Sequence, residues 1–176
     1  MKYKISSLGV DKLNRKQANR GMWFETVIGN VNRVYKHKRI AIIDKVATPI
    51  SYNTRTGKAR YQEKSTVDFV GCDNKGRYIA FDTKEVKLKN LPFKNVSDHQ
   101  VKYLTDTKRM GAEAFLLVLF RYNDTCFKLD IDQFNDFKKQ HERKSIPYEW
   151  FEENAGLVRS GNGVIYDYLH DVDHIK

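Results

Sequence analysis

The chain has 176 residues, enough for one domain with a hydrophobic core, and a net charge of +10 at pH 7. Its two cysteines are too few for a disulfide framework or a four-cysteine zinc site, which favours a reduced, cytoplasmic protein. The longest apolar run, residues 114–120, is far shorter than the roughly 20 residues that a membrane-spanning helix needs. The charged start lacks the apolar stretch of a secretory signal, so we expect neither a membrane span nor a leader.

The positive charge is concentrated in the first third of the chain. Residues 1–64 contain 15 lysines and arginines against 4 acidic residues, whereas residues 65–176 contain 17 against 18. Such asymmetry is typical of a surface that faces a polyanion. Aromatic residues are interleaved with the basic ones and no membrane-type amphipathic helix is evident, so nucleic acid is the favoured partner. The alternative is that the basic residues only keep a small protein in solution.

The first third predicts an arm, a helix, a strand and a ribbon. Residues 1–16 are polar and basic, and we expect a flexible arm there. Apolar residues recur at helical spacing within residues 17–35, which predicts a helix. Residues 39–47 predict a strand that ends at a Thr-Pro pair. The polar residues 50–64 predict two ribbon-like arms joined by a turn at residues 54–58.

The remaining chain continues the alternation of strands and helices. Residues 66–71 and 78–84 predict a β-hairpin whose turn is centred near Lys75. Residues 85–96 are expected to form a basic loop. Further elements are expected at residues 97–111 (helix), 114–120 and 125–129 (strands), and around 134–137 (helix). This order predicts one α/β domain over residues 1–176, with a mixed sheet flanked by helices.

The predicted hairpin carries an unusual set of charged residues. Because strand side chains alternate, Asp82 and Lys84 share one face, and the turn would place Asp68 almost opposite Asp82. Two carboxylates and one ammonium group on an apolar hairpin are costly to bury unless they are compensated. Lys84 can balance one carboxylate. A hard dication, Mg²⁺ or Mn²⁺, would balance the other, with the backbone carbonyl of Thr83 as a further oxygen ligand.

This set suits hydrolysis of a phosphodiester. A water bound to a divalent cation loses its proton more readily than bulk water. Lys84 could orient that water, help to deprotonate it, or offset negative charge in the transition state. The alternative is a structural salt bridge between Lys84 and one aspartate, with the other aspartate exposed. The spacing alone leaves both interpretations open.

Several segments in consistent order resemble the RecU family of Holliday junction resolvases, which belongs to the PD-(D/E)XK nuclease superfamily. They are residues 19–25 (NRGMWFE), 44–50 (DKVATPI), 65–68 (STVD), 76–85 (GRYIAFDTKE), 93–95 (FKN) and 98–100 (DHQ), within roughly residues 19–122. The resemblance implies a restriction-endonuclease-like fold with a protruding β-ribbon stalk. It implies a homodimer that resolves four-way DNA junctions by paired, Mg²⁺-dependent cuts. The small size is compatible with a bacteriophage origin.

The resemblance also implies roles for individual residues. Asp68 and Asp82 would bind the metal, Lys84 would be the catalytic lysine, Glu25 would reach the metal site directly or through water, and Gln100 would complete the polar lining. Residues 50–64 would form the stalk. DNA contacts are expected from Arg20, Lys45, Arg55, Lys58, Arg60, Tyr61, Lys87 and Lys89.

Two departures from the family pattern keep alternatives open. The second acid is usually Glu in the family and is Asp82 here, and the stalk is shorter than usual. The alternatives are a PD-(D/E)XK endonuclease that cuts duplex or other branched DNA, and a junction-binding protein without catalytic activity.

Overall fold

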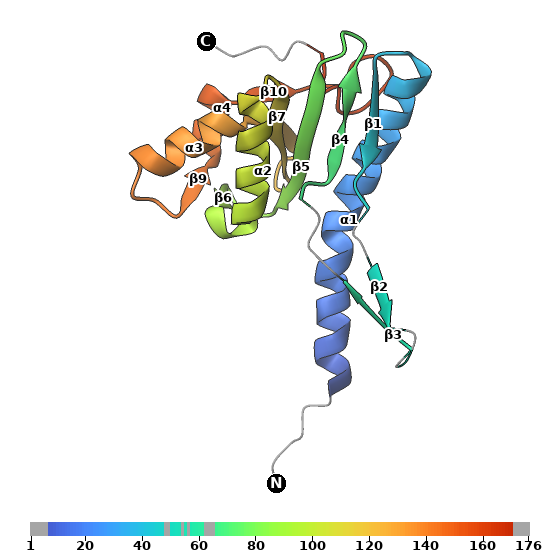
Figure 1. Ribbon diagram of the computed structural model, residues 1–176. Coiled ribbons are helices and arrows are strands. Elements are labelled where there is room, and N and C mark those ends of the chain that lie inside the picture. Colours follow the sequence, from blue (N-terminus) through green and yellow to red (C-terminus); the bar gives the residue numbers. More distant parts are fainter. Residues whose placement is uncertain (1–6, 48–49, 54, 56, 62–65, 171–176) are drawn as a thin grey trace.

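A six-stranded mixed sheet forms the centre of the computed structural model (Figure 1). The structure describes residues 7–47, 50–53, 55, 57–61 and 66–170, and only the backbone of residues 7–21, 50–53 and 58–61. The strand order is β1-β4-β5-β7-β8-β10. The strands are β1 (Ala41–Lys45), β4 (Phe69–Asp73), β5 (Tyr78–Val86), β7 (Glu113–Phe120), β8 (Thr125–Asp130) and β10 (Gly156–Val158). Only β5 and β7 pair in parallel within this sheet.

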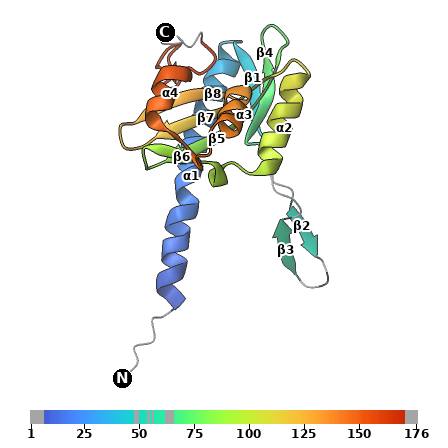
Figure 2. The ribbon, with the colours of Figure 1, turned by 90° about the vertical axis from the view of Figure 1, so that its left-hand side faces the viewer.

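Helices cover both faces of the sheet, which confirms the predicted α/β class. Helix α1 (Ser7–His37) and the segment after β10 pack on one face, through the core cluster that contains Phe24, Phe81 and Tyr168. Helices α2 (Asp98–Arg109), α3 (Ile131–Gln140) and α4 (Tyr148–Asn154) lie on the other face (Figures 1 and 2). Among the described residues, no helix is both long and apolar enough to cross a bilayer.

Helix α1 is longer than the sequence pattern predicted. The predicted apolar face comprises Phe24, Val27, Ile28, Val31 and Tyr35, and all of these are buried except Val27, which is half-buried. The expectation of a flexible arm over residues 1–16 is wrong for residues 7–16, which continue the helix to Ser7. This stretch contains leucine, lysine and arginine, which favour a helix, and no proline that would interrupt it. Residues 1–6 lie outside the described part.

A separate two-stranded ribbon projects from the body. Strands β2 (Ile50–Asn53) and β3 (Lys58–Tyr61) pair antiparallel, with Ile50 opposite Tyr61. Both ribbon views show it extending from the same end of the body as the N-terminal half of α1 (Figures 1 and 2). Strands β2 and β3 are therefore the two ribbon-like arms expected within residues 50–64, whereas residues 54, 56 and 62–64 lie outside the described part.

The hairpin of β4 and β5 has the predicted register. Phe69 pairs with Phe81 and Cys72 with Tyr78, which centres the turn on Lys75. Strand β4 begins at Phe69 rather than at residue 66, so Asp68 immediately precedes it. The rings of Phe69, Phe81 and Phe115 stack with centroid distances of 5.1 and 4.9 Å, which joins three neighbouring strands on the α1 side.

Residues 85–96, predicted as a basic loop, contain more regular secondary structure than expected. Strand β5 continues to Val86, and a short strand β6 (Asn90–Pro92) pairs with β9 (Ser145–Pro147). A 3₁₀ turn, η1 (Phe93–Asn95), then leads into α2. This connection fixes the start of α2 beside β5.

Candidate active site

Asp82 lies at the centre of the site. Asp82 belongs to β5 and has no exposed surface, and its side chain points toward α2. Gln100 Nε2 donates to Asp82 Oδ1 at 2.6 Å, and Lys84 Nζ lies 2.5 Å from Asp82 Oδ2. The predicted sharing of one face by residues 82 and 84 is consistent with this ion pair.

Gln100 is held by the first turn of α2. Ser97 donates to Gln100 Oε1 from its backbone N–H at 3.1 Å and from its hydroxyl at 2.9 Å. Lys84 Nζ donates to the same oxygen at 3.2 Å. The backbone contact is the return bond of a capping box, so the start of the helix and the site share one side chain. Ser97 was not predicted as a site residue, although the Ser-x-x-Gln spacing could have indicated it.

Asp68 sits over the backbone of β5 between Asp82 and Lys84. Asp68 Oδ2 accepts from the Thr83 backbone N–H at 2.8 Å and from the Thr83 hydroxyl at 2.6 Å. In an extended strand the N–H and C=O of one residue point to the same side, so the Thr83 carbonyl faces Asp68 as well. The contact through the Thr83 hydroxyl was not predicted.

Glu25 and Lys45 form the edge of the site. Glu25 lies on α1 and Lys45 ends β1, and their charged atoms are 2.6 Å apart. The side chain of Lys45 is 57% exposed. Lys45, predicted to contact DNA, therefore lies at the surface but is already paired with an acid.

The pKa of Asp82 shows how the charges of the site are balanced. Burial, followed by the negative charge of Asp68, raises the pKa of Asp82 to about 7, and the charge of Glu25 adds to this effect. Lys84 opposes the rise but does not cancel it. The Lys84 ammonium lies 2.5 Å from Asp82 Oδ2, and this ion pair is the contact through which Lys84 lowers the pKa of Asp82.

These features fit a hard divalent cation. Among the described residues, no three His, Cys, Asp or Glu side chains are arranged to hold a metal by themselves. Asp68 and Asp82 nevertheless offer carboxylate oxygens, and among the described residues Asp82 Oδ2 contacts only the ammonium of Lys84. Oxygen ligands of this kind select ions such as Mg²⁺, which usually keep several waters and need only one or two carboxylates. The structural salt bridge considered from the sequence is thus present, but Asp68 is turned into the site rather than exposed.

Of the predicted DNA-binding residues, Lys45 borders the site, and three others are described on the surface. Lys87, Lys89 and Arg55 are exposed, and Lys89 Nζ lies 5.1 Å from the centroid of the Tyr122 ring. The remaining four have side chains outside the described part: Arg20, Lys58, Arg60 and Tyr61. Their predicted DNA contacts remain predictions.

The mixed sheet with an Asp-x-Lys strand facing a second aspartate defines the PD-(D/E)XK class of nuclease folds. Within this class, residues 19–174 match the family RecU, described as Recombination protein U, and the chain belongs to this family. It is 30% identical to Holliday junction resolvase RecU of Bacillus subtilis, over 99% of this chain and 89% of that protein. It is 31% identical to Holliday junction resolvase RecU of Oceanobacillus iheyensis, over 92% of this chain and 89% of that protein. The solved structure of Hjc, a Holliday junction resolvase of Archaeoglobus fulgidus, matches 70% of this chain and 88% of its own, with a TM-score of 0.45 and 17% identity.

Proposed function

We propose that this protein is a Mg²⁺-dependent endonuclease that resolves four-way DNA junctions during recombination and repair. One observation carries the proposal: in a chain of the RecU family, Asp68, Asp82 and Lys84 meet around a single strand segment. The proposed substrate follows from the two RecU relatives, which are both named Holliday junction resolvases. A protein that acts on DNA in a bacterial or phage-infected cell would work in the cytoplasm.

The metal ligands follow from the orientation of the oxygens. Asp82 and Asp68 would hold Mg²⁺, with Mn²⁺ as a substitute, and the Thr83 carbonyl would be a third ligand. Glu25 would act through water, because its carboxylate is already bound to Lys45. When bound, the ion supplies a more acidic water and offsets charge on the phosphate.

The protein groups then position the reactants. Lys84 is 15% exposed in its side chain, so its ammonium can reach a phosphate oxygen while Asp82 and Gln100 hold it. There it stabilises the negative charge that grows on the phosphate in the transition state. Gln100 fixes both residues, since it donates to Asp82 and accepts from Lys84.

The DNA would be bound through its charge and shape. The excess of basic residues lies in residues 1–64, which include α1 and the ribbon. Exposed Arg55 is at the ribbon turn, and the ribbon would enter the open centre of the junction as a stalk. Lys87 and Lys89 would contact phosphates on the flank, together with Arg20, Lys45, Lys58 and Arg60, and Tyr61 would stack on a splayed base.

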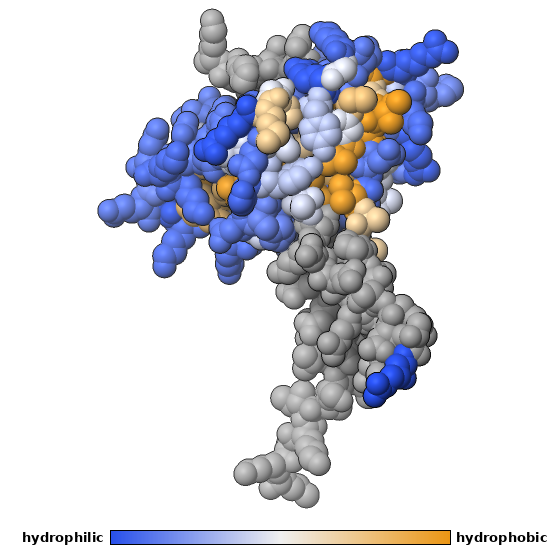
Figure 3. Space-filling model, in the orientation of Figure 1, coloured by the Kyte–Doolittle hydropathy of each residue, from blue (hydrophilic) through white to orange (hydrophobic). Residues whose placement is uncertain are grey.

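A homodimer would provide two active sites for the two cuts. Apolar residues gather at the surface over β1 and β4 (Figure 3), where Ile42 is 51% exposed and Tyr78 on neighbouring β5 is 40% exposed. Exposed apolar patches of this kind often mark protein interfaces. Equilibrium ultracentrifugation at micromolar concentration should show a dimer.

A second candidate is an endonuclease with relaxed selectivity for duplex or other branched DNA. The ribbon strands have only four residues each, which limits how far a stalk can enter a junction. Efficient cleavage of linear duplex, without preference for a junction, would favour this candidate.

Cleavage of a synthetic four-way junction, compared with a linear duplex of the same sequence, tests the proposal. With Mg²⁺ the wild type should nick two opposing strands of the junction and leave the duplex intact. Asp68→Ala, Asp82→Ala and Lys84→Ala should abolish cleavage but keep junction binding, and Lys139→Ala, an exposed change on α3, should cut normally. Junction binding without cleavage by the wild type under any metal condition would instead indicate a non-catalytic binding protein.

A further inference from the structure

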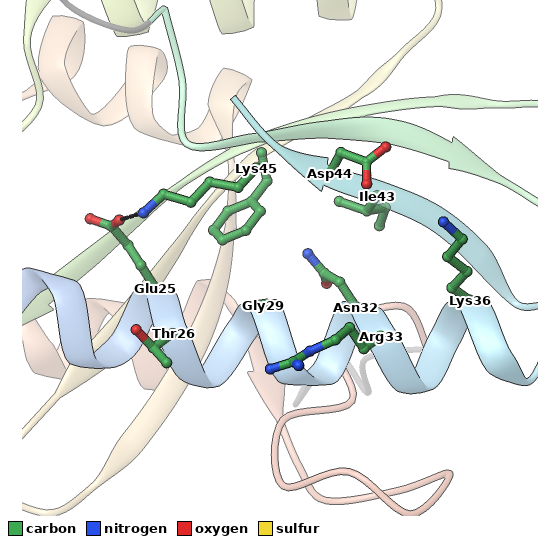
Figure 4. A pocket seen from close by; sticks show the side chains of 10 residues that line it. Glu25, Thr26, Gly29, Asn32, Arg33, Lys36, Ile43, Asp44 and Lys45 are labelled. Carbon is green, nitrogen blue, oxygen red and sulfur yellow. Dashed lines mark hydrogen bonds and ion pairs between the residues drawn. The ribbon is translucent and has the colours of Figure 1, made fainter. Parts of the chain in front are cut away.

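A pocket lies between α1 and the edge strand β1, with a volume of about 340 Å³ (Figure 4). Its floor on α1 is formed by Gly29, Asn32 and Arg33, and β1 covers it through Ile43 and Asp44. The ion pair of Glu25 and Lys45 borders one end, and Lys36 borders the other. The pocket is therefore next to the candidate active site but is built largely by other residues.

Asn32 presents an unused hydrogen-bond donor to this pocket. The residue is only 4% exposed, and its Oδ1 accepts from the Tyr168 hydroxyl. That bond leaves the amide nitrogen pointing from α1 toward β1 (Figure 4). Within the described residues, Asn32 Nδ2 has no hydrogen-bond partner. An unpaired buried donor is costly, so a ligand that supplies an acceptor oxygen at this point would be strongly favoured.

Gly29 leaves space at the same place. It lies inside a 31-residue helix, where glycine is less favourable than alanine. A Cβ added to Gly29 would meet nothing within 4 Å, so packing among the described residues does not require glycine. A group that enters the pocket from outside would account for both the missing side chain and the unpaired amide.

The charges around the pocket favour an anion, although the guanidinium of Arg33 also donates to Asn30 on the same helix. Glu25 and Lys45 neutralise one another, and Arg33 and Lys36 outweigh Asp44 by one positive charge. The fitting ligand is a small group with one negative charge and acceptor oxygens. We propose that the pocket binds a single phosphodiester of the DNA, distinct from the one that is cut. This inference rests on the proposed function and adds an anchoring point for the substrate beside the active site.

A substitution that fills the pocket should lower the affinity for DNA without lowering the stability of the protein. Gly29→Met should place a side chain in the open space and improve helix propensity, so the thermal midpoint should stay constant or rise. Affinity for a labelled four-way junction should nevertheless fall by about tenfold or more, as expected for loss of a charge-assisted contact. A purely structural role of Gly29 would change stability and leave affinity intact.

Lys36→Ala provides a second variant that does not depend on the tolerance of α1 for methionine. It should weaken binding and reduce the slope of log affinity against log salt by about 0.9, the value expected for one lost phosphate contact. Lys139→Ala on α3, at the other face of the sheet, is the matched control and should change neither.

Fluorescence anisotropy in EDTA, so that no cleavage occurs, measures these affinities beside size-exclusion chromatography of each variant. Wild-type affinity and salt slope in both Gly29→Met and Lys36→Ala would overturn the phosphodiester site while leaving the nuclease proposal intact. Loss of a dimer in these variants would also overturn it, because the pocket would then be a subunit contact. Absence of junction binding by the wild type would instead defeat the proposed function itself.

Discussion

Replacing Asp82 with asparagine should remove a pH dependence of stability that the active site creates. The pKa of Asp82 is raised from 3.8 to about 7, mainly by burial and by the charge of Asp68. The folded protein therefore keeps a proton on Asp82 at pH values where the unfolded chain has lost it. Its stability is greatest below the unfolded pKa and falls as pH rises from about 4 to about 7.

The size of this effect follows from the difference between the two pKa values. About three pH units correspond to about 4 kcal/mol over the whole window, and to about 3 kcal/mol between pH 5 and pH 8. The asparagine in the Asp82→Asn variant does not titrate. Between pH 5 and pH 8, the free energy of unfolding of this variant should therefore change by about 3 kcal/mol less than that of the wild type.

Urea unfolding in EDTA at pH 5 and pH 8, for both proteins, measures the difference. Adding Mg²⁺ at pH 8 should restore stability to the wild type and leave Asp82→Asn unchanged, because the ion would offset the buried negative charge. Parallel pH dependences in the two proteins would refute the reasoning, since the carboxylate would then be solvated rather than buried beside Asp68.

Three further predictions concern the surroundings of the site. Gln100→Ala should lower the cleavage rate by about 10²-fold or more while the dissociation constant for the junction stays constant, measured by single-turnover kinetics; unchanged rates would contradict its role in positioning. Tyr35→Phe removes the 2.7 Å bond to buried Asp167 and should cost about 1–3 kcal/mol in urea unfolding, whereas an unchanged midpoint would show that this carboxylate is satisfied otherwise. Gly71→Ala would bring a Cβ within 2.0 Å of the Ile42 carbonyl oxygen, so calorimetry should show a loss of about 1–3 kcal/mol, and wild-type stability would mean that β1 and β4 are farther apart.

The hairpin could be predicted because its information is local. The alternation of residues 78–84 and the turn residues around Lys75 determine which side chains share a face, and the observed register follows that expectation. The contact between Asp68 and Thr83 depends on the same register. The start of β4 was predicted three residues early, because Thr66 and Val67, just before the strand, are β-branched residues typical of strands.

Features that depend on tertiary packing were harder to predict from the sequence. The position of Gln100 against Asp82 requires α2 to pack beside β5, and only the family resemblance indicated it. Asp167 is 5% exposed and accepts a hydrogen bond from Tyr35, which is 132 residues away along the chain. No local pattern reports such a pair. The unpaired amide nitrogen of Asn32 has the same origin, because the hydrogen bond to its oxygen comes from Tyr168, far away along the chain.

The most direct test is a Mg²⁺ titration of junction cleavage after exhaustive treatment with EDTA. The metal-free protein should bind the junction and leave it intact, and added Mg²⁺ should restore paired cuts in the wild type but not in Asp82→Ala. Cleavage that persists without a divalent ion, or that survives in Asp82→Ala, would contradict a metal-dependent site built on this aspartate.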